Sequence, residues 1–496
     1  MIVKYIILFL YLGILFIIGM LASKKIAGAK DYFVGGKKLG YWVVAFSSRA
    51  TGESAWLLLG LTGMGAIIGL KALWVVLGEV LGVSIAWLFM AKPFKRLTDQ
   101  YDSITIPDYL VSHFKTSSNY LRIIAATALS LFVTIYVSAQ IDATGKAFES
   151  FLDWNYYTGA ITGFVIVTLY ITSGGFVAVA WSDLFQGLIM LLGLILLPIA
   201  ALLSIDNQAE IIDGLNAIDP SLFSIWGSGG FTILNFLSCI GLLMIGIGFM
   251  GSPQVFVRFM SINDEEEIDK GRWVAIVYTL LATGAAVLIG MLGRFMFTDA
   301  QQDVVAVLGN GAEQVLPIMV EHIFPITLVG IYIAAVLSAI MSTIDSLLVV
   351  ASSAVTRDFY QQIWNPQLKE ENMAKISRIV TITLAVFALA IALSVAVLSP
   401  TRNIFWFVIF GWSGIAATFC PVMILSLFWK KYTAHGAIAS MVTGFICVPV
   451  FKFVMPLIPG LGLYFEKLGE LTPAFFLAFI IGVVTSKFKK TRANDL

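Results

Sequence analysis

Long apolar blocks alternate with short polar connections along almost the whole chain. A helix needs roughly 20 apolar residues to cross the hydrocarbon core of a bilayer, and most of the blocks reach that length. The pattern predicts an all-α polytopic membrane protein with about 13 transmembrane helices. The predicted spans cover residues 4–22, 41–67, 72–95, 120–148, 156–172, 176–203, 230–257, 273–297, 324–356, 376–398, 403–428, 433–454 and 471–487.

Three blocks are longer than a straight crossing requires: 41–67, 230–257 and 324–356. Excess length indicates tilt, a break in the helix, or a helix that continues outside the bilayer. The first block is expected to be an uncleaved span rather than a signal peptide, because it lacks a clear cleavage site of small residues. We expect residues 1–496 to form a single transmembrane domain.

Composition agrees with this pattern and argues against several classes of function. Charged residues make up 12% of the 496 residues, compared with about a quarter in soluble proteins. The net charge of +1 and the lack of a long basic run give no indication of a nucleic-acid partner. The three cysteines follow no metal-ligand or disulfide spacing. Since no nucleophile–base pair is evident either, an enzyme is not expected.

Lysine and arginine in the connections predict the orientation, because these residues accumulate on the cytoplasmic side. If the spans alternate, the cation-rich connections all fall on one side, whereas connection 204–229 has no lysine or arginine. The N-terminus is then outside and the C-terminus in the cytoplasm, in the inner (plasma) membrane of the cell. The cations counted are Lys24, Lys25, Lys30, Lys37, Lys38, Lys92, Lys95, Arg96, Lys115, Lys430, Lys431, Lys487, Lys489, Lys490 and Arg492.

The connections contain no nucleotide-binding motif. Any transport is therefore expected to draw its energy from an ion gradient rather than from ATP. The partners that this predicts are the lipid bilayer, an ion and a small solute, with no obligatory protein partner.

Polar residues interrupt the second block at RATGESAW, residues 49–56. Arg49 and Glu53 are four residues apart and are expected to pair on one helix face, and Glu79 in the next span is a further partner for Arg49. Gly52 weakens the helix, so that backbone carbonyls and hydroxyls in this stretch become available to a cation. The alternative is a packing pair among small residues at a helix contact.

A second polar cluster lies near the middle of block 324–356. Ser342, Thr343, Asp345 and Ser346 bring hydroxyl and carboxylate oxygens into an apolar helix. Adjacent hydroxyls provide neutral oxygen ligands without a second buried charge. The alternative explanation is that the serine hydroxyls form hydrogen bonds to the backbone of their own helix and bind no ion.

Two further clusters leave similar alternatives open. In span 120–148, Tyr136 and Gln140 share a helix face, and Asp142 and Lys146 have the spacing of an ion pair. These side chains either form interhelical hydrogen bonds or contact a solute. Asp183 follows a Gly-Gly pair and is either a helix cap at the membrane surface or an acid along an ion path.

Six stretches together resemble the sodium/solute symporter family. Within that family, they are most similar to the bacterial sodium/proline symporter branch. They are DYFVGGKKLGYW, SSRATGESAWLLLGLTG, SITIPDYL, TSGGFVAVAWSDLFQG, SPQVFVRFM and LSAIMSTIDSLLVVASSAVTRD. The resemblance implies a leucine-transporter-like fold with two inverted repeats of five helices, over about 41–203 and about 230–428. Spans 4–22, 433–454 and 471–487 would be peripheral, and spans 41–67 and 230–257 would be broken around the substrate.

The resemblance also implies site residues. Sodium would be bound by the carbonyl oxygens of Ala50, Glu53 and Ala339 and by the hydroxyls of Ser342 and Thr343. Asp183 and Asp345 would lie along the sodium path. The implied substrate contacts are Thr51, Ser54, Ala55, Trp56, Tyr136, Gln140, Ile245 and Phe249. Three of these positions, Gln140, Ile245 and Phe249, are ones where this chain departs from the proline branch.

The departures bear on the solute. The proline branch has aspartate at the position of Gly52 and methionine at that of Glu53; it has tryptophan and tyrosine where this chain has Ile245 and Phe249. We therefore expect a secondary active symporter that couples Na⁺ entry to uptake of a small polar solute, such as proline or another amino acid, by alternating access. The alternatives are a sugar, organic acid or osmolyte as the solute, proton coupling through Glu53 or Asp142, a channel, or a membrane sensor.

Overall fold

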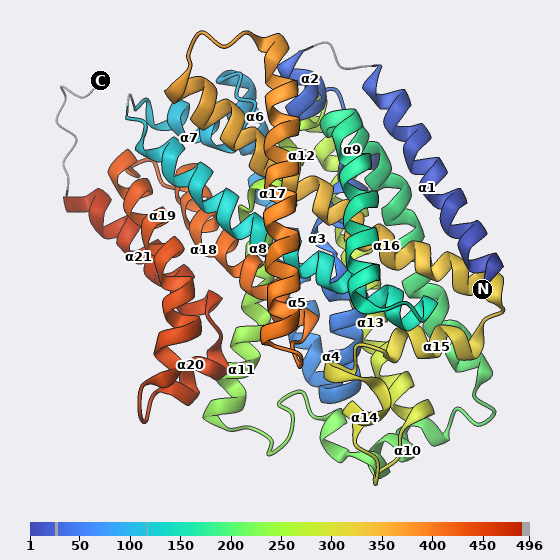
Figure 1. Ribbon diagram of the computed structural model, residues 1–496. Helices are drawn as coiled ribbons and strands as arrows, with labels where there is room; N and C mark the ends of the chain where they lie inside the picture. The colour runs from blue at the N-terminus through green and yellow to red at the C-terminus, as the bar shows by residue number, and fades with distance from the viewer. Residues whose placement is uncertain (25–27, 117, 489–496) are drawn as a thin grey trace.

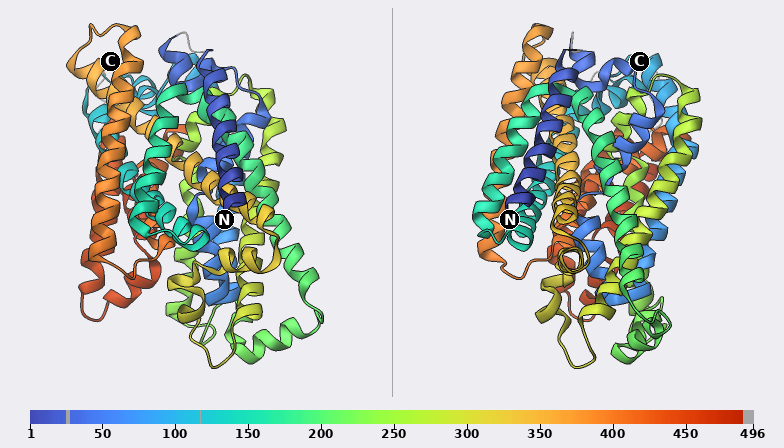
Figure 2. Two further views of the ribbon diagram at one scale, coloured as in Figure 1. Left: turned by 45° about the vertical axis from the view of Figure 1, so that its right-hand side comes forward. Right: turned by 90° about the vertical axis from the view of Figure 1, so that its right-hand side faces the viewer.

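The computed structural model describes residues 1–24, 28–116 and 118–488 as a bundle of helices (Figure 1). Within these ranges there is no strand, and Leu39 and Ile262 form only an isolated bridge. The expected all-α fold is confirmed. Most helices run between two ends of the molecule, and Figure 2 shows the same two ends from the side.

The α-helices are α1 (Ile2–Ser23), α2 (Ala29–Val34), α3 (Tyr41–Gly52), α4 (Thr62–Ile68), α5 (Leu73–Ile85), α6 (Ala91–Gln100), α7 (Ile106–Phe114), α8 (Tyr120–Leu152), α9 (Tyr156–Ser204), α10 (Glu210–Ile218), α11 (Ile233–Met244), α12 (Pro253–Ser261), α13 (Glu265–Phe297), α14 (Val304–Leu308), α15 (Val315–Ile323), α16 (Ile326–Ser353), α17 (Glu370–Leu398), α18 (Ile404–Phe428), α19 (Ala434–Pro449), α20 (Gly462–Leu468) and α21 (Leu471–Phe488). Shorter or wider turns join several of them: η1 (Gly35–Lys37), η2 (Trp56–Leu61), η3 (Gly69–Ala72), η4 (Ala86–Met90), η5 (Pro220–Phe223), η6 (Ile245–Met250), η7 (Asn310–Ala312), η8 (Ala354–Trp364), η9 (Val450–Val454) and η10 (Met455–Leu457).

Eleven helical stretches of the described chain are long and apolar enough to cross a membrane. Predicted span 156–172 is present as the shorter apolar helix Tyr156–Leu169. Predicted spans 41–67 and 72–95 share one of the eleven stretches, Trp56–Gln100, because the first of them is interrupted before Trp56. The observed helices agree with the expectation of about 13 spans once these interruptions are taken into account.

Two of the long blocks are broken. α3 ends at Gly52, Glu53 has non-helical backbone angles (φ −102°, ψ 85°), and the chain resumes as η2 and α4. In the second, α11 and η6 end before Gly251, and α12 begins at Pro253. Proline is suited to the first position of a helix because its missing N–H is not needed there. Both breaks lie inside protein, as irregular backbone in a membrane requires.

α5 and η6 pack with their backbones in contact, because glycines face one another. A Cβ built on Gly246 would lie 1.9 Å from the Gly78 carbonyl oxygen, and one on Gly82 would lie 1.9 Å from the Gly246 oxygen. Small residues allow such close approach of helices in membranes. η6 is thereby held firmly against α5.

α16 forms the centre of the core. All residues in its most apolar window are buried, compared with 28% for α1 and for α17. Figures 1 and 2 show α1 and α17 along the outside of the bundle. Polar groups on α16 are therefore enclosed by other helices rather than by lipid.

The connections sort to the two ends of the bundle. α2, α6 and α7, which contain or adjoin most of the cations used to predict orientation, lie together at one end, and α10 and α14 lie at the other (Figure 1). Lys25, Lys489, Lys490 and Arg492 from that prediction lie outside the described residues.

Candidate functional site

The break after α3 is held by side chains of α8. Gln140 donates from Nε2 to Ser54 Oγ over 3.0 Å and accepts from the Ala55 N–H at its Oε1 over 3.2 Å. Tyr136 donates to the same Ser54 oxygen over 3.3 Å. Backbone groups that a broken helix leaves free must find partners inside a membrane, and the Gln140 amide provides one. Gln140 therefore contacts the break itself.

Oxygen atoms of α3 and α16 meet on one side of this break. Ser342 Oγ donates to the Ala50 carbonyl over 2.9 Å and lies 3.3 Å from the Ala339 carbonyl oxygen. Thr343 Oγ1 donates to the next carbonyl, that of Thr51, over 3.1 Å. Carbonyl and hydroxyl oxygens of this kind are the ligands that hard cations prefer. The structure thus brings four of the five predicted sodium residues to one contact between two helices.

The fifth, Glu53, lies at the break and directs its side chain to Arg49. Arg49 Nη2 lies 2.7 Å from Glu53 Oε1 and also bonds Glu79 Oε1. The expected pairs of Arg49 with Glu53 and with Glu79 are both confirmed. Among the groups described, the Glu53 side chain contributes to this cluster rather than to the oxygens of α16.

Asp183 lies in the middle of a polar network on the same side as the α3–α16 oxygens. Its Oδ2 accepts from Ser47 Oγ over 2.6 Å and from Arg258 Nη2 over 3.0 Å. Arg258 also donates to Ser346 Oγ, and Asp345 lies next to Ser346 on α16. α9 changes direction at Gly175 (φ 57°), two turns before Asp183. Asp183 is therefore inside a helix, and its interpretation as a helix cap was wrong.

Thr51 belongs to this network too. Its Oγ1 lies 2.8 Å from Ser346 Oγ and 3.4 Å from Asp183 Oδ2. The structure does not bring the Thr51 side chain to the predicted substrate residues Trp56 and Tyr136, because residues 47 and 51 share the face of α3 that meets α9 and α16.

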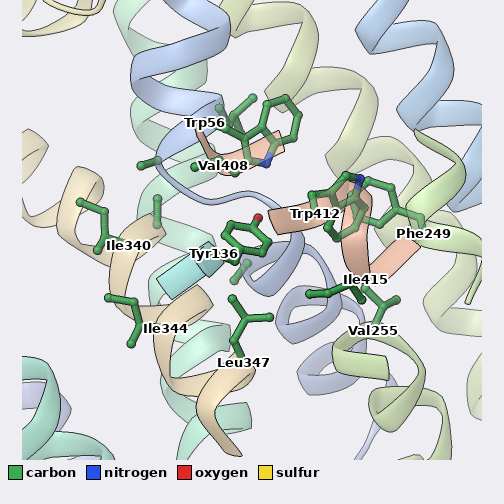
Figure 3. Close-up of a cluster of buried hydrophobic side chains, with 14 of the residues drawn as sticks. Trp56, Tyr136, Phe249, Val255, Ile340, Ile344, Leu347, Val408, Trp412 and Ile415 are labelled. Atoms are coloured by element: carbon green, nitrogen blue, oxygen red, sulfur yellow. The ribbon is translucent and has the colours of Figure 1, made fainter. Parts of the chain in front are cut away.

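Aromatic side chains enclose a small cavity on the other side of the break. Figure 3 shows Tyr136 lying near Trp56 and Trp412, with Phe249 packed beyond Trp412. The Phe249 and Trp412 ring centroids are 4.9 Å apart, and Trp412 Nε1 donates to the Ile245 carbonyl over 2.9 Å. The cavity is lined by Gly52, Trp56, Tyr136, Ile245, Phe249, Val408, Ile409 and Trp412.

This cavity is closed in the structure. It leaves about 10 Å³ for the centre of a water-sized sphere, which is room for about one water molecule. A solute the size of an amino acid requires the lining side chains to separate. The lining residues are all buried, so the described conformation is one in which the cavity has no room for such a solute.

Gly52 and Phe249 fit together across the two broken helices. A Cβ built on Gly52 would lie 2.5 Å from Phe249 Cε1, which is too close for any ordinary contact. The phenyl ring occupies the space that a side chain at position 52 would need. These two departures from the proline branch are therefore a matched pair.

Asp142 belongs to a separate network near α14 and η7. Its Oδ1 accepts from Tyr156 over 2.6 Å and from Arg402, and its Oδ2 forms the expected ion pair with Lys146 over the longer distance of 3.9 Å. Lys146 bonds Glu313 over 2.8 Å. Burial raises the pKa of Glu313, and the charge of Lys146 partly offsets that shift. The main partner of Asp142 is thus Arg402, which sequence spacing did not indicate.

Arg258 and Trp412 are two functional candidates that the sequence alone did not single out. Arg258 is fully buried in the SPQVFVRFM stretch. A charged residue in an apolar span is by itself a functional signal, and the buried acid at position 183 was a partner of opposite sign. Trp412 carried no such signal, because a tryptophan in an apolar span is most often packing.

Comparisons with known proteins agree on one group. A model described as the sodium:solute symporter family matches residues 32–444. The chain is 32% identical to the osmoregulated proline transporter OpuE of Bacillus subtilis, covering 97% of this chain and 95% of the relative. It is also 32% identical to the sodium/proline symporter of Escherichia coli, covering 97% and 92%.

Solved structures agree on the fold. A substrate-bound Na⁺-coupled sialic acid symporter superposes with a TM-score of 0.79 at 19% identity, covering 98% of both chains. Mhp1, a nucleobase-cation-symport-1 family transporter, superposes with a TM-score of 0.57 at 12% identity, covering 94% of this chain and 96% of that one. The expected leucine-transporter-like architecture is confirmed.

Proposed function

Because the chain belongs to the sodium:solute symporter family, we propose that it couples the inward movement of Na⁺ to the uptake of proline or another small amino acid. It is a multi-pass membrane protein of a transporter family. The two relatives named above are a proline transporter and a sodium/proline symporter. Proline is therefore the first solute to test.

One observation carries the ion-coupling part of this proposal. The Ser342 and Thr343 hydroxyls of α16 reach the Ala50 and Thr51 carbonyls of the broken helix α3. A sodium ion inserted among these oxygens would replace the direct hydrogen bonds and join the two helices. The five proposed ligands are the Ala50, Glu53 and Ala339 carbonyl oxygens and the Ser342 and Thr343 hydroxyls. Sodium binding on one side of the break would thereby fix the position of α3. The residues on the other side of the break form the proposed solute cavity.

The proposed cycle uses the two sides of the break in sequence. Na⁺ binds first and sets α3 against α16 in an outward-open state. The solute then enters between Trp56, Tyr136, Ile245 and Phe249, and the aromatic walls close. Na⁺ leaves past Asp183 and Asp345, which frees the solute to leave inward. Ser54 and Ala55 support the solute site through their contacts with Gln140.

The energy supplied is sufficient for strong accumulation. Each Na⁺ that crosses a potential of 100 mV contributes about 2.3 kcal/mol before the concentration term. At about 1.4 kcal/mol per tenfold, this supports roughly fifty-fold accumulation per ion.

We further propose that the protein lies in the plasma membrane with its N-terminus outside and its C-terminus in the cytoplasm. The gathering of α2, α6 and α7 at one end supports this orientation, since cation-rich connections mark the cytoplasmic side. The division into repeats over 41–203 and 230–428 is proposed with it, and the presence of one broken helix in each repeat supports that division.

Uptake into proteoliposomes tests the function. Radiolabelled proline should accumulate when an inward Na⁺ gradient is imposed at fixed pH, and should not when K⁺ replaces Na⁺. A panel of other amino acids, sugars, organic acids and osmolytes, each with and without Na⁺, covers the other solute classes. If no solute in the panel responds to Na⁺, and Ser342→Ala with Thr343→Ala changes nothing, the proposal fails.

A further inference from the structure

One buried tyrosine, Tyr11, ties the first helix to the interior of the bundle. Its helix, α1, lies outside both proposed repeats and runs along the outside of the bundle (Figures 1 and 2). Tyr11 is only 3% exposed, whereas its neighbours Phe9 and Leu10 are 70% and 62% exposed. A hydroxyl inside a membrane protein needs hydrogen-bond partners, because burial without them is costly. The proposed transport cycle gives this side chain no role.

The Tyr11 hydroxyl has its partners on two different helices. It accepts from Gln186 Nε2 of α9 over 3.0 Å and from Ser338 Oγ of α16 over 3.0 Å. It also lies 4.0 Å from Met341 Sδ of α16. A serine inside a helix can bond to its own backbone, but Ser338 donates to another helix. A single oxygen atom of α1 therefore links α9 to α16.

Both partners lie one helical turn from residues of the proposed ion path. Gln186 follows Asp183 by three positions on α9, and Ser338 precedes Ser342 by four positions on α16, so that each pair shares a helix face. Gln186 Oε1 is buried and has no hydrogen-bond partner among the described residues, so the bond to Tyr11 is the one that orients this amide. Tyr11 thus lies directly behind the groups that would receive and release the ion.

We propose that Tyr11 is a positioning residue for the proposed sodium site. Its hydroxyl holds α9 and α16 at the separation at which Na⁺ is retained, and loss of its bonds lets Na⁺ leave more easily past Asp183. Groups behind metal ligands commonly tune affinity in this way. The inference rests on the proposed sodium symport. The solute cavity should be unaffected, because Tyr11 is not among its lining residues.

Binding of ²²Na⁺ to the purified protein, with no solute present, tests the inference. Tyr11→Phe keeps the ring and removes only the hydroxyl, and it should weaken Na⁺ binding roughly three- to tenfold, the effect of about one hydrogen bond. Tyr5→Phe is the matched control on α1, because the Tyr5 hydroxyl accepts from Trp154 in the connection between α8 and α9. It should bind Na⁺ like the wild type. Equal affinity of Tyr11→Phe and the wild type would overturn the proposal.

A double-mutant cycle shows whether Tyr11 acts through α16. Ser338→Ala should weaken Na⁺ binding, and Tyr11→Phe/Ser338→Ala should be little weaker than the worse of the two single variants. Strict additivity would contradict the proposed link. In uptake measurements, Tyr11→Phe should raise the Na⁺ concentration needed for half-maximal uptake and leave the solute KM at saturating Na⁺ unchanged. A merely structural role would instead lower the melting midpoint and alter both constants, and that result would overturn the proposal.

Hydrogen exchange in Na⁺-free buffer provides a readout that does not depend on the ion. Peptides that contain Gln186 and Ser338 should exchange their amide hydrogens faster in Tyr11→Phe than in the wild type or in Tyr5→Phe. Unchanged exchange would show that the hydroxyl does not hold α9 and α16 together. If the wild type binds Na⁺ and Tyr11→Phe binds it equally well, this inference alone is wrong. If the wild type binds no Na⁺, the proposed sodium site is wrong and the inference fails with it.

Discussion

The two sides of the break after α3 are formed by different kinds of chemical group. The side proposed to bind the ion, called the ion side, consists of backbone carbonyls and short hydroxyls, such as the Ala50 carbonyl and Ser342 Oγ. The side proposed to bind the solute, called the solute side, consists of large side chains such as Trp56, Phe249 and Trp412. Backbone geometry is fixed once two helices pack, whereas a cavity of large side chains changes with each substitution. A chain can therefore keep the ion of its relatives while its solute changes, and variants on each side should separate the two properties.

The largest effect is expected from disrupting the buried ion pair of Arg258 and Asp183, which lies on the ion side of the break. Arg258→Met leaves Asp183 buried without its cation, and removal of one partner of such a pair costs about 3–5 kcal/mol. The melting midpoint of the purified protein should fall sharply. Arg258→Met combined with Asp183→Leu should recover much of the midpoint without recovering Na⁺-dependent uptake.

Arg96→Met is the matched control for this experiment, because the Arg96 side chain is 70% exposed in its pair with Glu265. Exposed pairs contribute little to stability, so this variant should melt close to the wild type. Equal destabilisation by Arg96→Met and Arg258→Met would contradict the assignment.

The next effect separates ion affinity from solute affinity. Ser342→Ala and Thr343→Val each remove one proposed sodium ligand, and each should weaken the apparent Na⁺ affinity roughly tenfold, at about 1.4 kcal/mol per ligand. The solute KM at saturating Na⁺ should change much less. Ser353→Ala is the control on the same helix, because the Ser353 hydroxyl bonds to the backbone of its own helix at Val350. If these variants shifted the solute KM without shifting the Na⁺ affinity, the assignment of Na⁺ to this side of the break and of the solute to the other side would be wrong.

On the solute side, Gly52 and Phe249 should behave as one unit. Gly52→Ala drives a methyl group into the Phe249 ring, and overpacking of this kind costs about 1–3 kcal/mol. Solute uptake should fall in Gly52→Ala. The double variant Gly52→Ala/Phe249→Ala should take up more solute than Gly52→Ala alone. A double-mutant cycle on uptake and on the melting midpoint measures this coupling. Strict additivity would show that the contact is unimportant.

The smallest effect concerns the brace across the break. Gln140→Ala removes the bonds to Ser54 and Ala55, and we expect a loss of about 1 kcal/mol in solute affinity. Gln140→Glu keeps an acceptor for the Ala55 N–H and should lose less. Ser138→Ala is the control on α8, since the Ser138 hydroxyl bonds to the Ile135 carbonyl of the same helix. A weaker Na⁺ affinity in Gln140→Ala would place this residue on the ion side.

Sequence reasoning was strongest where a property is local. Hydropathy located the spans, and the four-residue spacing of Arg49 and Glu53 predicted their ion pair. The glycine and hydroxyl residues around Gly52 indicated where the helix would break. Each of these follows from a few neighbouring residues and the geometry of a single helix.

Partners far apart in the chain were beyond the same reasoning. Asp142 does pair with Lys146, four residues away, but its closer partner, Arg402, lies 260 positions along the chain and was not predicted. Arg258 was overlooked because its acid lies on another helix. Thr51 was placed with the solute because of its neighbours, although its side chain meets Asp183 and Ser346. In all three cases, the packing of helices decides the contact, and one sequence does not reveal that packing.

The glycine contacts between α5 and η6 have a consequence for how solute preference can change over evolutionary time. η6 carries two of the cavity residues, Ile245 and Phe249, yet its backbone has no room to retreat toward α5. Space for a larger solute must therefore come from replacing side chains, such as Phe249 on η6 itself or Tyr136 and Trp412 on α8 and α18, and not from a shift of the η6 backbone.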